Sequence, residues 1–112
     1  MRKIASHRIL DVKTGAILAM HVVEITPDGS VARTYPLCGE SQNIEWLPGL
    51  LIQSPEAPAI AMLAGECFSE FVRRMQKKTI GNESDSKLYW VSPFNVSQME
   101  FCPSTRIIPL NG

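Results

Sequence analysis

The chain has 112 residues, of which 45% are hydrophobic and 20% charged, as expected for one ordinary globular domain. Lys+Arg and Asp+Glu both number 11, so strong attraction to nucleic acid or to an anionic membrane lacks its usual driving force. No apolar run approaches the roughly 20 residues of a membrane span, and the N-terminal MRKIASHRILDV lacks the apolar core of a signal peptide.

The cysteines indicate the redox environment. There are three, Cys38, Cys67 and Cys102, and no C-x-x-C pair. An odd number of widely spaced cysteines predicts free, mostly buried thiols in a reducing compartment. We therefore expect a cytoplasmic protein with neither a nucleic-acid nor a membrane partner.

The first half of the chain is predicted to be β. Residues 3–12 and 16–25 are runs rich in apolar and β-branched residues, and the short turn KTG between them predicts a hairpin. The segment TPDGS predicts a second turn, because its proline fixes φ and Asp-Gly tolerates positive φ. Residues 31–37 are then a third strand, with Pro36 at a sheet edge.

The stretch IEWLPGLLIQSPE interrupts this pattern. Residues 44–47 are predicted to be a fourth strand, which Pro48-Gly49 stops at the rim of the sheet. Residues 50–52 are a short further strand, and the prolines that follow suit the first turn of a helix.

One amphipathic helix is predicted over residues 58–78, because apolar positions recur there with the period of a helix face. These positions are Ile60, Leu63, Ala64, Cys67, Phe68, Phe71, Val72 and Met75. The basic run RRMQKK fills the last turns, and Gly81 offers a C-terminal stop. We expect this helix to be a core element.

The last third returns to β. Residues 87–92 are a strand that Pro93 ends, residues 93–100 form a turn of helix or an irregular corner, and residues 104–110 are a final strand with Pro109 at an edge. The predicted fold class is α+β and mostly β: a small sheet folded on itself as a pseudo-barrel or sandwich, with one helix over a face or opening.

Two histidines, His7 and His21, are the candidate metal ligands. Both lie in the first hairpin, and pairing across KTG could bring them together. Zinc usually takes three or four protein ligands, and no third residue has suggestive spacing. Ordinary hydrogen-bonded strand histidines are therefore the favoured interpretation, and no cofactor is expected.

Nucleophilic catalysis finds little support. Cys67 lies on the predicted apolar helix face as a small core residue, whereas Cys38 and Cys102 lie in loop-like segments. A cysteine nucleophile needs a base within reach, and although His7 or His21 could serve, nothing nearby in the sequence supports this. No catalytic residue is predicted.

The basic run allows two interpretations. Arg73, Arg74, Lys77 and Lys78 could bind phosphate at the helix end, or they could be a solvated helix C-terminus that suits the macrodipole and pairs with Glu70. The zero net charge of the chain favours the second interpretation.

IEWLPGLLIQSPE resembles the segment by which enzymes of the amidohydrolase superfamily leave a small β domain and enter a metal-binding barrel. In that family Leu/Val-Pro-Gly, an aliphatic pair and Asp or Asn are followed, one residue later, by His-x-His, whose histidines bind metal. Leu47-Pro48-Gly49-Leu50-Leu51 fits this pattern, but Ile52 stands at the Asp/Asn position. Ser54 and Glu56 stand at the two histidine positions, so the resemblance implies that both metal ligands are absent.

The C-terminal KLYWVSPFNVSQMEFCPSTRIIPL is similar to the closing segment of cytosine-deaminase-like and chlorohydrolase-like members of this superfamily. Phe94-Asn95 stands where they have Pro-Phe-Asp, and residues 102–107 stand at the place of Thr-Pro-x-Ser/Thr-Arg-Val. The resemblance thus covers the two ends of the chain, in the order found in the family.

The resemblance implies one composite domain over residues 1–112 that lacks the catalytic barrel. Residues 1–52 would be its N-terminal β segment and residues 87–112 its C-terminal β segment. Residues 53–86, with the helix, would bridge them in place of the barrel and cover apolar surface. We expect any remaining apolar patch to support a homodimer.

Three functions follow as expectations. The first is a non-catalytic structural or interaction module derived from an amidohydrolase. The second is an accessory subunit of a separately encoded metal-dependent hydrolase barrel that acts on C–N or C–Cl bonds. The third is a small-ligand-binding protein or cysteine enzyme with a new pocket beside His7, His21 and a cysteine.

Overall fold

The fold begins with the long antiparallel hairpin that the KTG turn predicts. The computed structural model describes residues 2–38, 43–55, 62–81 and 85–110. Strands β1 (Arg2–Asp11) and β2 (Ala16–Ile25) pair along their length. In the turn, the Gly15 N–H donates to the Asp11 carbonyl at 2.8 Å, and Gly15 has φ +75°, which glycine adopts without steric cost.

Three further strands extend this hairpin on both sides. Strand β3 (Val31–Pro36) pairs antiparallel with the outer edge of β2, so the predictions of a strand here and of Pro36 at a sheet edge are confirmed. Strands β4 (Ile44–Trp46) and β5 (Leu50–Pro55) both run parallel to β1. The predicted strand 50–52 is therefore real but longer, because β5 stays paired as far as Pro55.

The C-terminal segment forms a second hairpin, from β6 (Ser86–Asn95) and β7 (Glu100–Pro109). The prediction that Pro93 ends the strand is wrong, and the predicted turn of helix or irregular corner over 93–100 is confined to a turn at 96–99. The register shifts between Ser92 and Phe94, so the missing N–H of Pro93 falls at an irregular position and the strand continues. Pro109 lies on an edge strand, as predicted.

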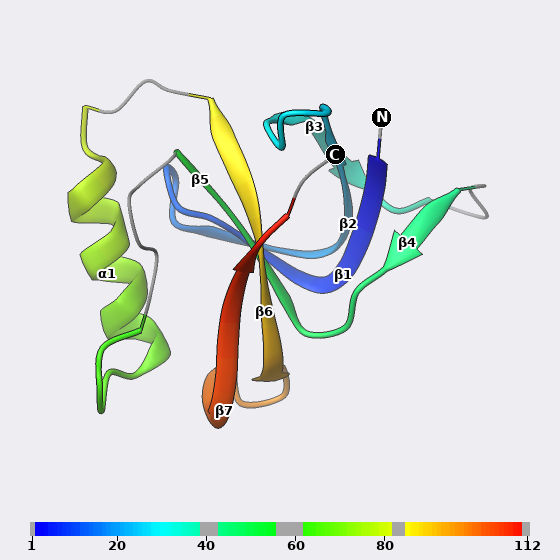
Figure 1. Cartoon of the computed structure of the whole chain (residues 1–112). Helices are drawn as coiled ribbons and strands as arrows, with labels where there is room; N and C mark the ends of the chain where they lie inside the picture. The colour runs from blue at the N-terminus through cyan, green and yellow to red at the C-terminus, as the bar shows by residue number, and fades with distance from the viewer. Residues whose placement is uncertain (1, 39–42, 56–61, 82–84, 111–112) are drawn as a thin grey trace.

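All seven strands belong to one mixed sheet in which the order is β3-β2-β1-β5-β6-β7, with β4 paired to β1 beside this path. The N-terminal and C-terminal hairpins meet through β5 and β6, which pair antiparallel from Leu50–Val91 to Pro55–Ser86. Figure 1 shows the single helix standing to one side of this strongly twisted sheet. The described part of the chain is thus mostly β with one helix, in agreement with the predicted α+β class.

The helix is shorter than predicted. Helix α1 spans Phe68–Thr79, whereas the apolar spacing predicted residues 58–78. Residues 58–61 lie outside the described residues, but residues 62–67 are not helical. The Glu66 N–H donates to the Leu63 carbonyl in a tight turn, and the helix begins only after Cys67, whose N–H donates to the Glu70 carboxylate.

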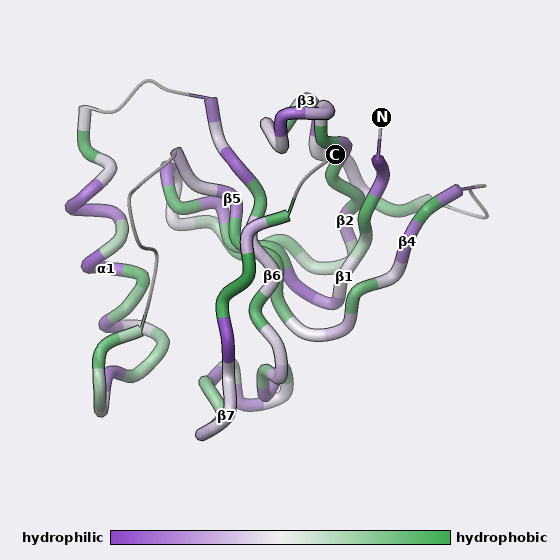
Figure 2. The backbone as a smooth tube through the Cα atoms, viewed as in Figure 1, coloured by the Kyte–Doolittle hydropathy of each residue, from purple (hydrophilic) through white to green (hydrophobic). Residues whose placement is uncertain are grey.

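The early part of the predicted helix face is correspondingly not buried. Leu63 and Ala64 are exposed, and Gly65 has φ +75°, which a helix interior does not accommodate. The predicted core role of the helix is confirmed for Phe68, Phe71 and Met75, which are buried. Figure 2 shows hydrophobic and hydrophilic residues alternating along α1, as an amphipathic helix requires.

The buried side chains form two clusters. The first lies between the sheet and α1, where Phe68 and Phe71 pack with residues of β1, β5 and β6. Phe68 makes edge-on ring contacts with Phe94 at 5.2 Å and with Phe101 at 5.6 Å between centroids. The second cluster consists of Ile4, Ile9, Val23, Ile25, Leu51 and Leu88. Alternate residues of β5 contribute to the two clusters, so this strand is covered on both faces.

Candidate functional site

The turn at Pro48-Gly49 is held by residues of two strands. The Gly49 N–H donates to Nδ1 of His7 at 3.2 Å, and the Ser6 hydroxyl donates to the Gly49 carbonyl at 3.1 Å. From β6, Nε1 of Trp90 donates to the Pro48 carbonyl at 2.9 Å. The Pro48-Gly49 turn, which belongs to the amidohydrolase-like motif, is therefore hydrogen-bonded to both β1 and β6 at the point where β5 begins.

Gly49 cannot be replaced at this point without strain. Its φ is +104°, and a Cβ atom there would lie 2.9 Å from the carbonyl oxygen of Val91. This oxygen belongs to the backbone of Val91 and not to a flexible side chain, so it cannot move aside by a change of rotamer. The glycine of the Pro-Gly motif is thus required by local geometry.

Of the two positions that correspond to the family's metal-binding histidines, the structure describes only the first, Ser54. Ser54 is fully buried in β5, and its hydroxyl donates to the Pro55 carbonyl at 3.2 Å. Its strand partner is Lys87 of β6. Glu56, at the second position, lies outside the described residues.

The two candidate histidines have separate contacts. His7 accepts the Gly49 N–H and packs edge-on against Trp46, with ring centroids 4.9 Å apart. His21 is paired in the register with Ser6, and its Nδ1 lies 2.9 Å from the Ala19 carbonyl. Among residues 2–38, 43–55, 62–81 and 85–110, no three His, Cys, Asp or Glu side chains are grouped so that they could hold a metal ion.

The hairpin is irregular between these two histidines. Ile4 and Ile9 lie an odd number of residues apart in β1, yet both belong to the second buried cluster, so the alternation of side chains reverses between them. Met20, with φ +54°, occupies the matching part of β2, because the pairs Ser6–His21 and Arg8–Ala19 flank it. The register of the hairpin is nonetheless the same on both sides of this point.

The cysteines are dispersed. Cys38 is exposed, and Cys102 is half-buried in β7. The expectation that Cys67 is a core residue on the helix face is wrong, because Cys67 is the residue before the first helical turn and is only half-buried. Bonds from the Cys67 thiol and N–H lower the pKa of Glu70, so the pair acts as a helix cap.

The basic run lies on an open face of α1. Arg74 binds Glu66 at 2.8 Å, which lowers the pKa of Glu66. Glu70, Arg73, Arg74 and Lys77 line a shallow, open depression. This arrangement matches a solvated helix face better than an enclosed phosphate site.

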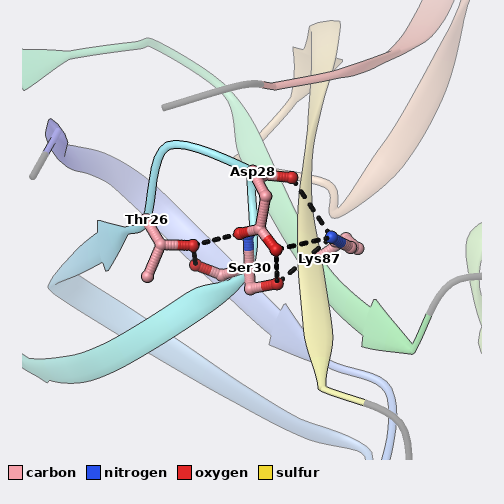
Figure 3. A network of polar contacts seen from close by, with 4 residues as sticks. All are labelled: Thr26, Asp28, Ser30 and Lys87. Carbon is pink, nitrogen blue, oxygen red and sulfur yellow. Dashed lines mark hydrogen bonds and ion pairs between the residues drawn. The ribbon is translucent and has the colours of Figure 1, made fainter.

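Lys87, at the start of β6, fastens the turn between β2 and β3 (Figure 3). Its Nζ donates to the Asp28 carbonyl and to the Ser30 hydroxyl, each at 3.1 Å, and lies 3.7 Å from Oδ2 of Asp28. Hydrogen bonds from Thr26 and then Ser30 hold the pKa of Asp28 at about 2. Ser30 and Lys87 also form an isolated antiparallel bridge, so β6 holds the turn that precedes β3.

Glu24 is a buried carboxylate that the sequence did not single out. It is 3% exposed and binds the Arg33 guanidinium at 2.7 Å. The hydrogen bond from the Tyr35 hydroxyl, and then the bond from Arg33, lower the pKa of Glu24. All three residues lie on β2 and β3, so their association could have been found only from the strand register.

Large apolar side chains remain exposed on the hairpin and beside it. Ile17 is 47% exposed, and Met20 and Trp46 are each 44% exposed. Ala16 and Ala19 are also exposed, whereas the residues of β2 from Val22 to Ile25 are buried. The first half of β2 is therefore an apolar stretch that the rest of the described chain leaves uncovered.

Comparison with protein-family models, with curated proteins and with solved structures found no match to this chain. Within the described ranges, the one helix is too short and too polar to cross a membrane.

Replacing Gly49 by alanine should destabilise the fold. We expect Gly49→Ala to cost about 1–3 kcal/mol for its backbone conformation and a further amount for the contact with the Val91 carbonyl. Gly65→Ala is the matched control, since Gly65 has φ +75° but open space around it. Chemical denaturation of both variants measures the difference, and equal losses would contradict a steric role for the turn.

The Asp28 network should make stability depend on pH in the acid range. The pKa of Asp28 is lowered from 3.8 to about 2 on folding, so its contribution is complete above pH 3.8 and is lost as the pH falls towards 2. The difference in unfolding free energy between the wild type and Asp28→Asn should shrink over that interval. Asp85→Asn, an exposed aspartate outside the network, is the control, and a difference that does not vary with pH would refute the assignment.

Proposed function

We propose that this chain is a non-catalytic interaction module, a small composite β domain like that of the amidohydrolase superfamily but without a catalytic barrel. It acts by association rather than by a reaction, and its principal partner is a second copy of itself. No catalytic residue, metal or cofactor is assigned to it.

One observation carries the proposal. Strand β5 continues without a break from Leu50 to Pro55, lies between β1 and β6, and is buried along its whole length. In the resembling enzymes, this part of the chain leads to the metal-binding histidines. Here Ser54 points into a fully buried position and its hydroxyl is bound to backbone, which supports a structural role for the segment.

The sheet arrangement supports the composite character of the domain. The N-terminal segment supplies β1 to β5 and the C-terminal segment supplies β6 and β7, and the two join through β5 and β6. The Ser30–Lys87 bridge, together with a hydrogen bond at 2.9 Å from Thr34 of β3 to Gln53 of β5, draws β3 towards the far side of the sheet. We interpret this curvature as a sheet folded on itself as a pseudo-barrel.

Exposed apolar surface supports association. Ile17, Met20 and Trp46 each leave more than two fifths of their surface accessible, and the exposed half of β2 carries no charge. Contiguous exposed apolar surface marks interaction sites, and Ala16, Ile17, Ala19 and Met20 supply such a stretch along β2. The zero net charge of the chain removes long-range repulsion between copies.

Metal analysis tests the non-catalytic part of the proposal. The purified protein should hold no stoichiometric zinc or iron after dialysis against a chelator, because Ser54 offers no imidazole at the first ligand position. Elemental analysis by mass spectrometry gives the metal-to-protein ratio. One tightly held metal per chain would contradict the proposal, and His7→Ala and His21→Ala would then show whether either histidine binds it.

Sedimentation velocity tests the interaction part. We expect a reversible monomer–dimer equilibrium that shifts towards the dimer as the protein concentration rises, because the apolar surface is buried on association. Purification from the native host distinguishes the alternative of an accessory subunit, in which a hydrolase barrel acting on C–N or C–Cl bonds would co-purify. A chain that remains monomeric and alone at every concentration would refute the proposal.

A further inference from the structure

The turn TPDGS contains an Asp-Gly pair, whose chemistry the proposed function does not use. Asp28-Gly29 lies between β2 and β3, and Gly29 has φ +88°. In such a pair the backbone nitrogen of the glycine can attack the side-chain carboxyl carbon of the aspartate, because glycine has no side chain that obstructs the approach. The turn therefore carries the residues of a spontaneous backbone modification.

The modification starts from the protonated carboxyl group of Asp28. The Gly29 nitrogen forms a bond to Cγ of Asp28, the bond from Cγ to its hydroxyl breaks, and water leaves with the amide proton. A second water molecule then opens the resulting cyclic imide. Opening at Cγ restores aspartate, whereas opening at the main-chain carbonyl carbon leaves the chain running through Cγ as isoaspartate, with an additional carbon atom in the backbone.

The nucleophile of this reaction is engaged in the folded chain. The Gly29 N–H donates to the Thr26 carbonyl at 2.9 Å, inside the turn. Attack requires the nitrogen to give its proton to water or to another base, and the Thr26 carbonyl occupies the place that this base would take. The same bond fixes the orientation of the planar peptide unit, so a change of orientation requires the turn to open first.

The carboxylate is engaged as well. Oδ1 of Asp28 accepts hydrogen bonds from the Thr26 hydroxyl and from the Ser30 N–H, the latter at 3.1 Å. Oδ2 accepts from the Ser30 hydroxyl at 3.2 Å and lies 3.7 Å from Nζ of Lys87 (Figure 3). These donors favour the ionised form, in agreement with the lowered pKa of Asp28. An ionised carboxylate is a poor electrophile, because it has no hydroxyl that can leave.

We propose that Asp28-Gly29 is a latent isoaspartate site, which the contacts of Thr26, Ser30 and Lys87 keep unreactive while the turn is folded. Both reacting groups must be released before the ring can close, so the rate follows the population of molecules in which the turn is open. This inference goes beyond the proposed function and does not depend on it.

Isoaspartate would damage the part of the sheet that the turn supports. The additional carbon atom would lie directly before Gly29, between two residues that are already paired. On one side the Thr26 N–H donates to the Ser30 carbonyl at 2.9 Å, and Ser30 also forms the bridge to Lys87. A longer connection between them does not fit both sets of bonds, so the start of β3 would separate from β6. The contacts of Asp28 thus preserve the turn chemically as well as holding it in place.

A pair of threonine-to-valine variants tests the proposal. Thr26→Val keeps the side-chain shape and the backbone carbonyl but removes the hydroxyl that donates to Asp28, whereas Thr34→Val removes a hydroxyl that donates to Gln53 outside the turn. The folded proteins are incubated in mildly acidic buffer, and isoaspartate at residue 28 is measured by peptide mapping with mass spectrometry. Relative to the wild type, we expect isoaspartate to form about tenfold faster or more in Thr26→Val and no more than about twofold faster in Thr34→Val.

The unfolded wild type supplies the reference rate and needs no variant. In denaturant, isoaspartate should form about tenfold faster or more than in the folded protein, and circular dichroism establishes that both variants are folded during the incubation. A folded wild type that reacts as fast as the unfolded chain overturns the proposal, because the contacts then give no protection. Equal rates in Thr26→Val and Thr34→Val also overturn it, since release of Asp28 would then make no difference.

Discussion

The fold depends on the pairing of β5 with its two neighbours. Every residue of this strand is buried, and it is the only connection in the sheet order between the N-terminal hairpin and the C-terminal hairpin among the described strands. Its backbone is satisfied by β1 on one side and β6 on the other. Strand β6 pairs with β5 over the whole length of β5 and β1 pairs with it from Leu50 to Gln53, and burial on both faces gives the strand a large apolar transfer energy.

The Pro48-Gly49 turn sets where β5 begins. Its carbonyls accept from Ser6 and Trp90, and its N–H is bound by His7, so β1 and β6 both hold it. With Gly49 at φ +104° and the Val91 carbonyl close by, the chain passes from β4 into β5 within three residues. Helix α1 can then cover the side of β5 that carries Leu50 and Ile52, while Leu51 packs into the second cluster.

The covered and exposed halves of the outer edge of β2 have a common origin. Strand β3 is short and is held by the Asp28–Lys87 contacts at its start, so it covers only the second half of β2. Its end at Pro36 and the irregularity at Met20 leave the first half of β2 exposed. The exposed first half of β2, which we assign to self-association, is thus a consequence of the hydrogen bonds that hold the turn before β3 against β6.

Local signals predicted much of this architecture. The KTG and TPDGS turns located the first three strands because turn chemistry acts over a few residues. Apolar periodicity identified the helix but placed its start too early, since the pattern extends upstream of Gly65 while the capping bonds of Cys67 and Glu70 determine where it begins. Pro93 does not end β6, because the pairing of β6 with β7 shifts register at this residue. Such a shift depends on the partner strand and is not visible in the local sequence.

Of the candidate sites, the sequence could identify residue types but not their neighbours. Two histidines in one hairpin suggested a shared site, yet the register pairs His21 with Ser6, and the Pro-Gly turn engages His7. The contacts of Asp28 with Lys87, and of Ser6 with Gly49, join residues far apart in the chain. By itself the sequence determined the strand-rich class, the turns, the presence of one helix and the neutral charge, because these follow from local conformational preferences and composition. Only the tertiary structure decided which strands are neighbours, what Ser54 faces and which edge stays open, because these depend on the pairing of distant backbone segments.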